Sequence, residues 1–181
     1  MKRIVKALLA PLTAALAVVG CSTAPVETYQ GEKPVLDLAR YFNGTVDGWG
    51  MFQDRSGKVL KRFCVRIDAS WTGNVGTLDE HFEWSDGKKT RRIWTVTKLD
   101  DHRYSGTAAD VIGTAAGTAY GNALRWRYVL NLETDDGKTY EVDFDDWMYL
   151  IDERTMLNRS YMSKFGFELG QVTLSFTRRD S

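Results

Sequence analysis

Apolar side chains recur at every second position through most of this 181-residue chain, and this spacing restricts the fold more than any other feature. The clearest runs are 63–69, 124–132, 142–150 and 172–176. Such alternation is typical of strands that turn one face to a core and the other to solvent. Asp/Gly segments that favour tight hairpin turns separate several runs, at 54–57, 85–87 and 135–137.

Short connections make neighbouring strands antiparallel. We count nine or ten strands, and the one candidate helical turn lies at residues 35–41. A meander of this length must either close on itself or split into two packed layers, and closure removes exposed strand edges. The sequence therefore predicts an all-β domain over residues 36–181, an antiparallel up-and-down barrel of about 8–10 strands. An open sandwich is the alternative. A membrane-spanning barrel is disfavoured, because outward positions such as Arg62 and Arg125 are charged.

The N-terminus has the parts of a secretory signal: basic residues within the first six, an apolar stretch, and small Gly20 before Cys21. Gly20-Cys21 resembles a bacterial lipobox, which implies acylation of Cys21 and cleavage before it. We therefore predict a lipoprotein signal peptide over 1–20 and a lipidated tether over 21–35. The alternative, a transmembrane helix, would be interrupted by Lys6 and Pro11, and a bilayer needs about 20 predominantly apolar residues.

The residue after Cys21 is Ser22 rather than Asp, which by the sorting rule of Gram-negative lipoproteins implies the periplasmic face of the outer membrane. The signal carries three positive charges and the whole chain has a formal net charge of +0, so the mature chain carries −3. This argues against a nucleic-acid partner, which needs a basic surface. Cys64 remains as a lone thiol, and we expect it to be a small buried hydrophobe.

One predicted strand has almost no side chains on one face. From Gly113 to Ala123, every odd position is Gly or Ala. Two interpretations follow. A tryptophan from a neighbouring strand, such as Trp126 or Trp147, lies across the bare face, or the bare face lines a ligand cavity.

Three charged residues share a face with apolar neighbours: Glu80, Arg92 and Asp146. A buried charge is costly unless it is paired. The pattern therefore suggests an ionic cluster inside the barrel, with Lys164 as a candidate fourth member. Alternatively, a bulge turns Asp146 outward and Arg92 ends its strand in solvent.

Catalytic and metal templates are missing from the sequence. His81 and His102 stand apart, and no zinc-protease or nucleophile-elbow spacing occurs. Glu80 and Asp146 are the one carboxylate pair that could act as acid and base. We predict no metal and no cofactor, assign no catalytic residue, and leave enzymatic activity open.

Several segments resemble the DUF3833 family of bacterial lipoproteins, over about residues 36–178. The segments are 104–113, Gly121-Asn122-Ala123-Leu124-Arg125-Trp126-Arg127-Tyr128, Asp145-Asp146-Trp147-Met148, Asn158-Arg159-Ser160 and Met162-Ser163-Lys164-Phe165-Gly166. The resemblance implies a lipocalin-like barrel and a lipid or envelope role. It brings no catalytic residues. Its motif positions and the charged inward faces together give nine candidate ligand-binding residues: Glu80, Arg92, Trp94, Asp110, Trp126, Asp146, Trp147, Asn158 and Lys164.

These features predict a periplasm-facing outer-membrane lipoprotein that binds or shuttles an apolar or amphipathic, lipid-like molecule. Its predicted partners are the membrane, through the acyl chains on Cys21, and that small molecule. The alternative is a structural or assembly factor that contacts another envelope protein.

Overall fold

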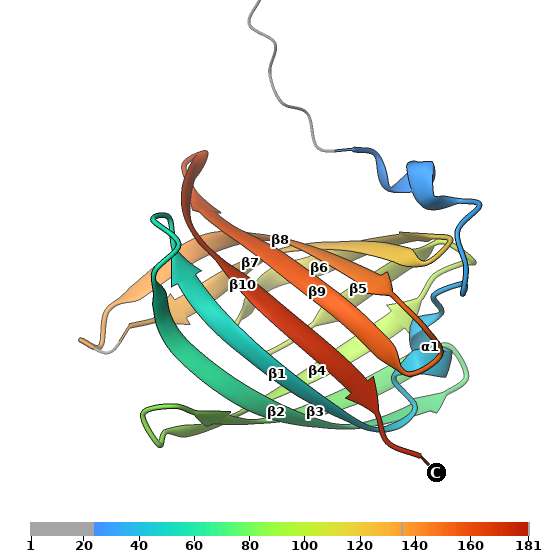
Figure 1. Cartoon of the computed structure of the whole chain (residues 1–181), viewed down its shortest axis with the longest axis horizontal. Helices are drawn as coiled ribbons and strands as arrows, with labels where there is room; N and C mark the ends of the chain where they lie inside the picture. Colours follow the sequence, from blue (N-terminus) through green and yellow to red (C-terminus); the bar gives the residue numbers. More distant parts are fainter. Residues whose placement is uncertain (1–23, 135, 181) are drawn as a thin grey trace, which may run out of the picture.

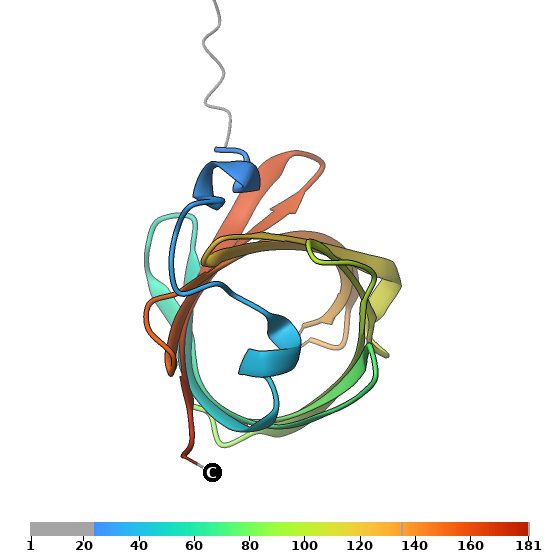
Figure 2. The ribbon, with the colours of Figure 1, turned by 90° about the vertical axis from the view of Figure 1, so that its right-hand side faces the viewer.

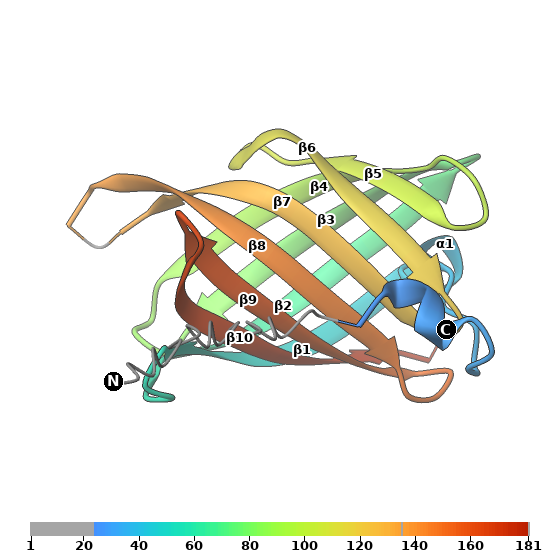
Figure 3. The same ribbon diagram turned by 90° about the horizontal axis from the view of Figure 1, so that it is seen from above.

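The computed structural model describes residues 24–134 and 136–180, so the predicted signal peptide and Cys21 lie outside the described residues. Within these ranges, ten strands follow one another in chain order around a closed barrel, and β1 pairs with β10 (Figures 1 and 3). The predicted antiparallel up-and-down barrel is confirmed, and the open sandwich is not formed. The strands are β1 (Gly44–Asp54), β2 (Val59–Thr72), β3 (Val75–Trp84), β4 (Lys89–Lys98), β5 (Arg103–Thr107), β6 (Val111–Tyr120), β7 (Ala123–Glu133), β8 (Thr139–Leu150), β9 (Thr155–Lys164) and β10 (Phe167–Arg178).

A short helix, α1 (Leu38–Tyr41), lies across one end of the barrel (Figure 2). It confirms the helical turn expected at 35–41. The Asp37 carboxylate begins the helix by accepting hydrogen bonds from the backbone N–H of Ala39 (2.8 Å) and Arg40 (3.3 Å), which satisfies N–H groups that a helix start leaves free.

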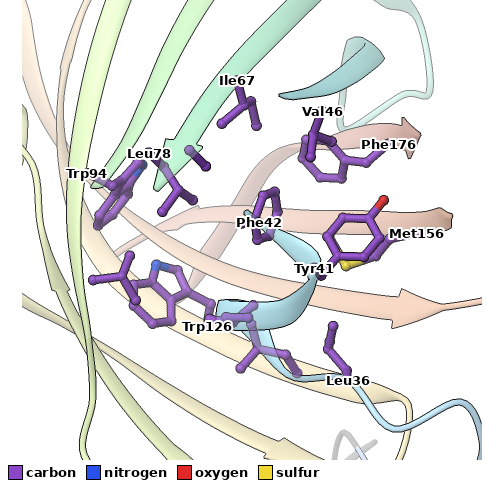
Figure 4. Close-up of a cluster of buried hydrophobic side chains, with 14 of the residues drawn as sticks. Leu36, Tyr41, Phe42, Val46, Ile67, Leu78, Trp94, Trp126, Met156 and Phe176 are labelled. Atoms are coloured by element: carbon purple, nitrogen blue, oxygen red, sulfur yellow. The ribbon is translucent and has the colours of Figure 1, made fainter. Parts of the chain in front are cut away.

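The side chains around α1 close this end with apolar packing. Tyr41 and Phe42 point into the barrel among Val46, Met156 and Phe176 (Figure 4). The Trp71 indole N–H donates a hydrogen bond to the Phe42 carbonyl at 2.8 Å, so this backbone carbonyl next to α1 is also paired.

Part of the segment before α1 lies against the barrel. A 3-10 turn, η1 (Val26–Tyr29), packs on the outside of the barrel, where Val26 joins a buried cluster with Ala123 and Trp147. The Tyr29 ring lies 6.3 Å from the Trp147 ring, between centroids. Within the predicted tether, Val26 and Tyr29 therefore pack on the aromatic surface around Trp147, while most other residues of 24–35 are exposed.

The bare face of β6 is covered by a tryptophan. A Cβ on Gly117 would overlap the Trp126 ring, and one on Gly106 of β5 would lie 2.6 Å from Trp126 Cζ2. Of the two interpretations, aromatic packing by Trp126 is confirmed, and Trp147 lies elsewhere. Gly113 takes a positive φ of 69° where the β6–β7 register shifts, so the alternation does not continue through it.

Cys64 lies on the outward face of β2 and is exposed, so the expectation of a buried thiol was wrong. Its neighbours Phe63 and Val65 are buried, and a strand turns adjacent residues to opposite faces. In the described part of the chain, helices are all too short or too polar to cross a membrane.

Candidate ligand-binding cavity

The barrel encloses a cavity of about 770 Å³. Its wall extends from Leu38 and Phe42 at the α1 end to Lys88 and Thr134 beside the turns at the opposite end. Most of the lining is aromatic or aliphatic, including Phe63, Trp71, Phe82, Trp84, Trp94 and Tyr128. The sequence places these side chains inside because each occupies an inward position of a strand that alternates at period two.

A partly buried ion pair lies on one wall of the cavity. Glu80 on β3 and Arg92 on β4 are cross-strand partners, and Arg92 Nη1 lies 4.0 Å from Glu80 Oε2. Arg92 Nε also donates to Asp110 Oδ2 at 2.9 Å. Asp110 belongs to the β5–β6 connection, so three chain segments meet around one guanidinium.

A second polar group lies on β8 and β9. Asp146 is only 7% exposed and is the cross-strand partner of Trp126 and of Ser160. The Ser160 hydroxyl donates to Asn158 Oδ1 at 3.3 Å, and Asn158 Nδ2 donates to the Trp147 carbonyl at 3.2 Å. One Asp146 oxygen, Oδ1, is buried without a hydrogen-bond partner among the described residues.

Burial raises the pKa of both inward acids. The pKa of Glu80 rises to about 7 because the carboxyl is removed from water, although the Arg92 charge opposes this rise. The pKa of Asp146 also rises to about 7, again through burial, with the Ser160 and Tyr128 hydroxyls acting in the opposite direction. A nearby positive charge usually lowers the pKa of an acid. Because the pKa of both acids is raised, the effect of burial here is larger than the opposing effect of the Arg92 charge. The cavity therefore holds two carboxyls that change charge near neutral pH.

The structure brings together most of the predicted site residues. Seven of the nine candidates line the cavity: Glu80, Arg92, Trp94, Asp110, Trp126, Asp146 and Asn158. The predicted pairing of Glu80 with Arg92 is present, with Asp110 as the second acid, whereas Asp146 lies inside without an ion pair to Arg92. Neither alternative, an outward Asp146 or an Arg92 that ends in solvent, is observed.

Trp147 and Lys164 do not line the cavity. Trp147 follows Asp146 and so faces outward, where it packs against Val26. Lys164 ends β9, and its Nζ lies 5.1 Å from the Tyr140 ring centroid. Lys164 is therefore not a member of the ionic cluster, because its strand has already reached the end of the barrel.

Sequence reasoning missed several polar cavity residues, among them Tyr128 and Ser160, whose hydroxyls lie near Asp146. Both could have been found, since Tyr128 shares its parity with Trp126, and Ser160 shares its parity with Asn158. Among the described residues, no group of three His, Cys, Asp or Glu side chains could hold a metal ion.

A closed antiparallel meander with a hollow interior defines a lipocalin-like β-barrel protein. The S-type phycobiliprotein lyase CpeS from Guillardia theta has this fold: the TM-score is 0.60 at 8% sequence identity, over 87% of this chain and 99% of the lyase. A de novo designed fluorescence-activating β-barrel aligns with a TM-score of 0.44 at 13% identity, over 80% of this chain and 99% of the design. The chain belongs to the DUF3833 family, described as protein of unknown function, whose model matches residues 15–178. No curated protein matches the sequence.

Proposed function

We propose that this protein is a lipid-anchored carrier that binds or shuttles an apolar or amphipathic, lipid-like molecule inside its barrel. The cavity of about 770 Å³ carries the proposal. Ligand sites typically measure roughly 300–1,000 Å³ and combine apolar walls with a few polar groups. A filled core would have favoured the alternative, an assembly factor, and the hollow interior favours a carrier.

The anchor in this proposal is Cys21, acylated after removal of residues 1–20, at the periplasmic face of the outer membrane of a Gram-negative bacterium. Several acyl chains would give stable attachment where one gives only marginal binding. Mass spectrometry of the mature N-terminus and fractionation of the two membranes test this part. An unmodified residue 21, or a protein in the soluble fraction, would contradict it.

The charges of the cavity support a particular kind of polar head. The whole lining holds four acids (Glu80, Asp110, Glu133, Asp146) and four cations (Lys61, Lys88, Arg91, Arg92). At Arg92 itself, however, two acids, Glu80 and Asp110, pair with one cation, so acceptors exceed charged donors at this point of the wall. A ligand head that donates hydrogen bonds, such as a hydroxyl or an amine, fits this wall. A free carboxylate would add a further negative charge beside Glu80, and like charges at close range repel in a low-dielectric interior.

Displacement of a fluorescent apolar probe tests the proposal. We expect the protein to bind the probe, and a long-chain alcohol to displace it more strongly than the fatty acid of equal length at pH 8. Val172→Trp should narrow the cavity and weaken binding, because Val172 lines it. Thr173→Trp is the matched control, since the next residue is exposed on the outside. Equal binding by both variants, or none by the unmodified protein, would contradict a carrier.

A further inference from the structure

The β9–β10 hairpin ends in two exposed phenylalanines. Phe165 is 85% exposed and Phe167 is 76% exposed. The β1–β2, β3–β4 and β7–β8 turns at the same end of the barrel have polar sequences instead, Arg55-Ser56-Gly57-Lys58, Ser85-Asp86-Gly87-Lys88 and Thr134-Asp135-Asp136-Gly137-Lys138. Exposed phenylalanine is therefore specific to the β9–β10 turn and is not shared by these three turns.

Neither folding nor turn geometry accounts for Phe165. Its φ is +53°, the left-handed region that bulky side chains avoid. A two-residue turn of this kind favours Asn-Gly, and here Gly166 is present while phenylalanine occupies the asparagine position. The Phe165 side chain is also not buried by the barrel. An aromatic residue that is unfavourable for the backbone and adds little to the core is explained by contact with something outside the chain.

The position of the hairpin indicates what it contacts. Figures 1 and 2 show that the β9–β10 turn and η1 project from the same side of the barrel, and Figure 1 shows them near opposite ends of its long axis. The described chain begins at Ala24, three residues after Cys21. Three extended residues span at most about 11 Å. An acylated Cys21 would therefore keep the η1 side of the barrel close to the bilayer surface, on the side from which the hairpin projects.

We propose that the β9–β10 hairpin is a second membrane contact, with Phe165 and Phe167 inserted into the headgroup region of the bilayer that holds Cys21. Aromatic side chains are favoured at this depth. Two contacts near opposite ends would lay the barrel along the membrane and keep the cavity end that lies beyond Lys88 and Thr134 near the lipid. The docking rests on acylation of Cys21 and does not require that the cavity binds lipid.

Charge plays a minor part in this contact. The hairpin carries Lys164 and Glu168, which offset each other, and Lys164 Nζ lies 5.3 Å from the Phe165 ring centroid. We therefore expect docking on phosphatidylcholine as well as on anionic vesicles, with little loss at high salt, in contrast to a contact that depends on basic residues.

The test uses the acylated mature chain, which begins at Cys21, reconstituted in phosphatidylcholine vesicles that contain headgroup-labelled nitroxide lipid. An environment-sensitive fluorophore is attached through Glu168→Cys, in a Cys64→Ser background that removes the other exposed thiol. The matched control carries the fluorophore through Asp86→Cys, in the β3–β4 turn at the same end. We expect blue-shifted, strongly quenched emission at position 168 and neither effect at position 86. Phe165→Ser with Phe167→Ser should abolish the shift and the quenching at position 168.

Several results would overturn the proposal. Equal quenching at 168 and 86 would mean that the barrel has no fixed orientation, and quenching that survives both serine substitutions would remove the phenylalanines from the contact. A photocrosslinker at position 165 that captures one discrete protein in cells, in place of lipid, would assign the hairpin to a protein partner. If the unsubstituted protein did not bind vesicles at all, the acyl anchor on which the docking rests would be absent, and the proposal would fall with it. Binding of the apolar probe in solution reports separately on the carrier function, and the serine substitutions should leave it unchanged.

Discussion

Glu80 and Arg92 face each other on neighbouring strands inside the barrel, with Arg92 Nη1 4.0 Å from Glu80 Oε2. The same guanidinium bonds Asp110 at 2.9 Å. One cation therefore compensates two acids from separate chain segments, in a cavity lined mostly by aromatic and aliphatic side chains.

Arg92→Met should lower the free energy of unfolding by about 1–2 kcal/mol at pH 7, because removal of the cation leaves two partly buried carboxyls without their charge partner. Urea denaturation measures the loss. Arg91→Met is the matched control, since the preceding residue pairs with Asp79 on the outer surface and an exposed pair contributes at most about 1 kcal/mol. Equal losses in the two variants would mean that the inner ion pair has no special weight.

Stability should fall as pH rises from about 5 to 8. The pKa of Glu80 and that of Asp146 are each about 7 in the folded protein, against ordinary values of 4.5 and 3.8. The folded chain therefore binds more protons than the unfolded chain in this window, so the free energy of unfolding falls as pH rises towards 7 and levels off above it, where both states are deprotonated. Chemical denaturation at four pH values measures the slope.

Glu80→Gln and Asp146→Asn should each flatten this pH dependence. At pH 8, each amide should gain at most about 3–4 kcal/mol relative to the charged parent, since one pKa unit corresponds to about 1.4 kcal/mol. The gain should be smaller for Glu80→Gln, because the amide leaves Arg92 short of a partner. A wild-type slope of zero between pH 5 and 8, or a slope that both variants retain, would contradict the raised pKa values.

Gly117→Ala should destabilise the barrel by about 1–3 kcal/mol, because the added Cβ overlaps the Trp126 ring and overpacking forces side chains out of place. Near-UV circular dichroism should report the displaced tryptophan, and thermal unfolding the lost stability. Ala116→Ser, one residue earlier on the exposed face, should change stability by no more than about 0.5 kcal/mol. An unchanged aromatic spectrum in Gly117→Ala would show that Trp126 does not pack against this glycine.

Val26→Asp should release η1 from the barrel without unfolding it, because a buried valine in contact with the Trp147 cluster becomes an unpaired charge. Amide hydrogen exchange should rise over residues 24–36 and stay low in the strands. Thr28→Asp, on the exposed side of the same turn, should leave exchange unchanged. Fast exchange of the segment in the parent protein would mean that η1 is not docked.

The barrel could be predicted from the sequence because alternation is a local property. Each residue of a strand faces opposite to its neighbour, so Phe63 and Val65 inside imply Cys64 outside, and the same rule places Glu80, Arg92 and Asp146 inward. The expectation of a buried Cys64 was wrong because it relied on the usual burial of cysteine and not on this parity. Short polar turns then made the strands antiparallel and consecutive.

Only the tertiary structure decided which inward residues meet. Parity states which way a side chain points, but the distance between two inward side chains depends on strand register and on closure of the barrel. These place Asp110 from the β5–β6 connection against Arg92, lay Trp126 over Gly106 and Gly117, and leave a hollow of about 770 Å³. They also place Lys164 beyond the cavity and Val26 on Trp147. The alternation of apolar and polar residues along a strand could not predict either placement.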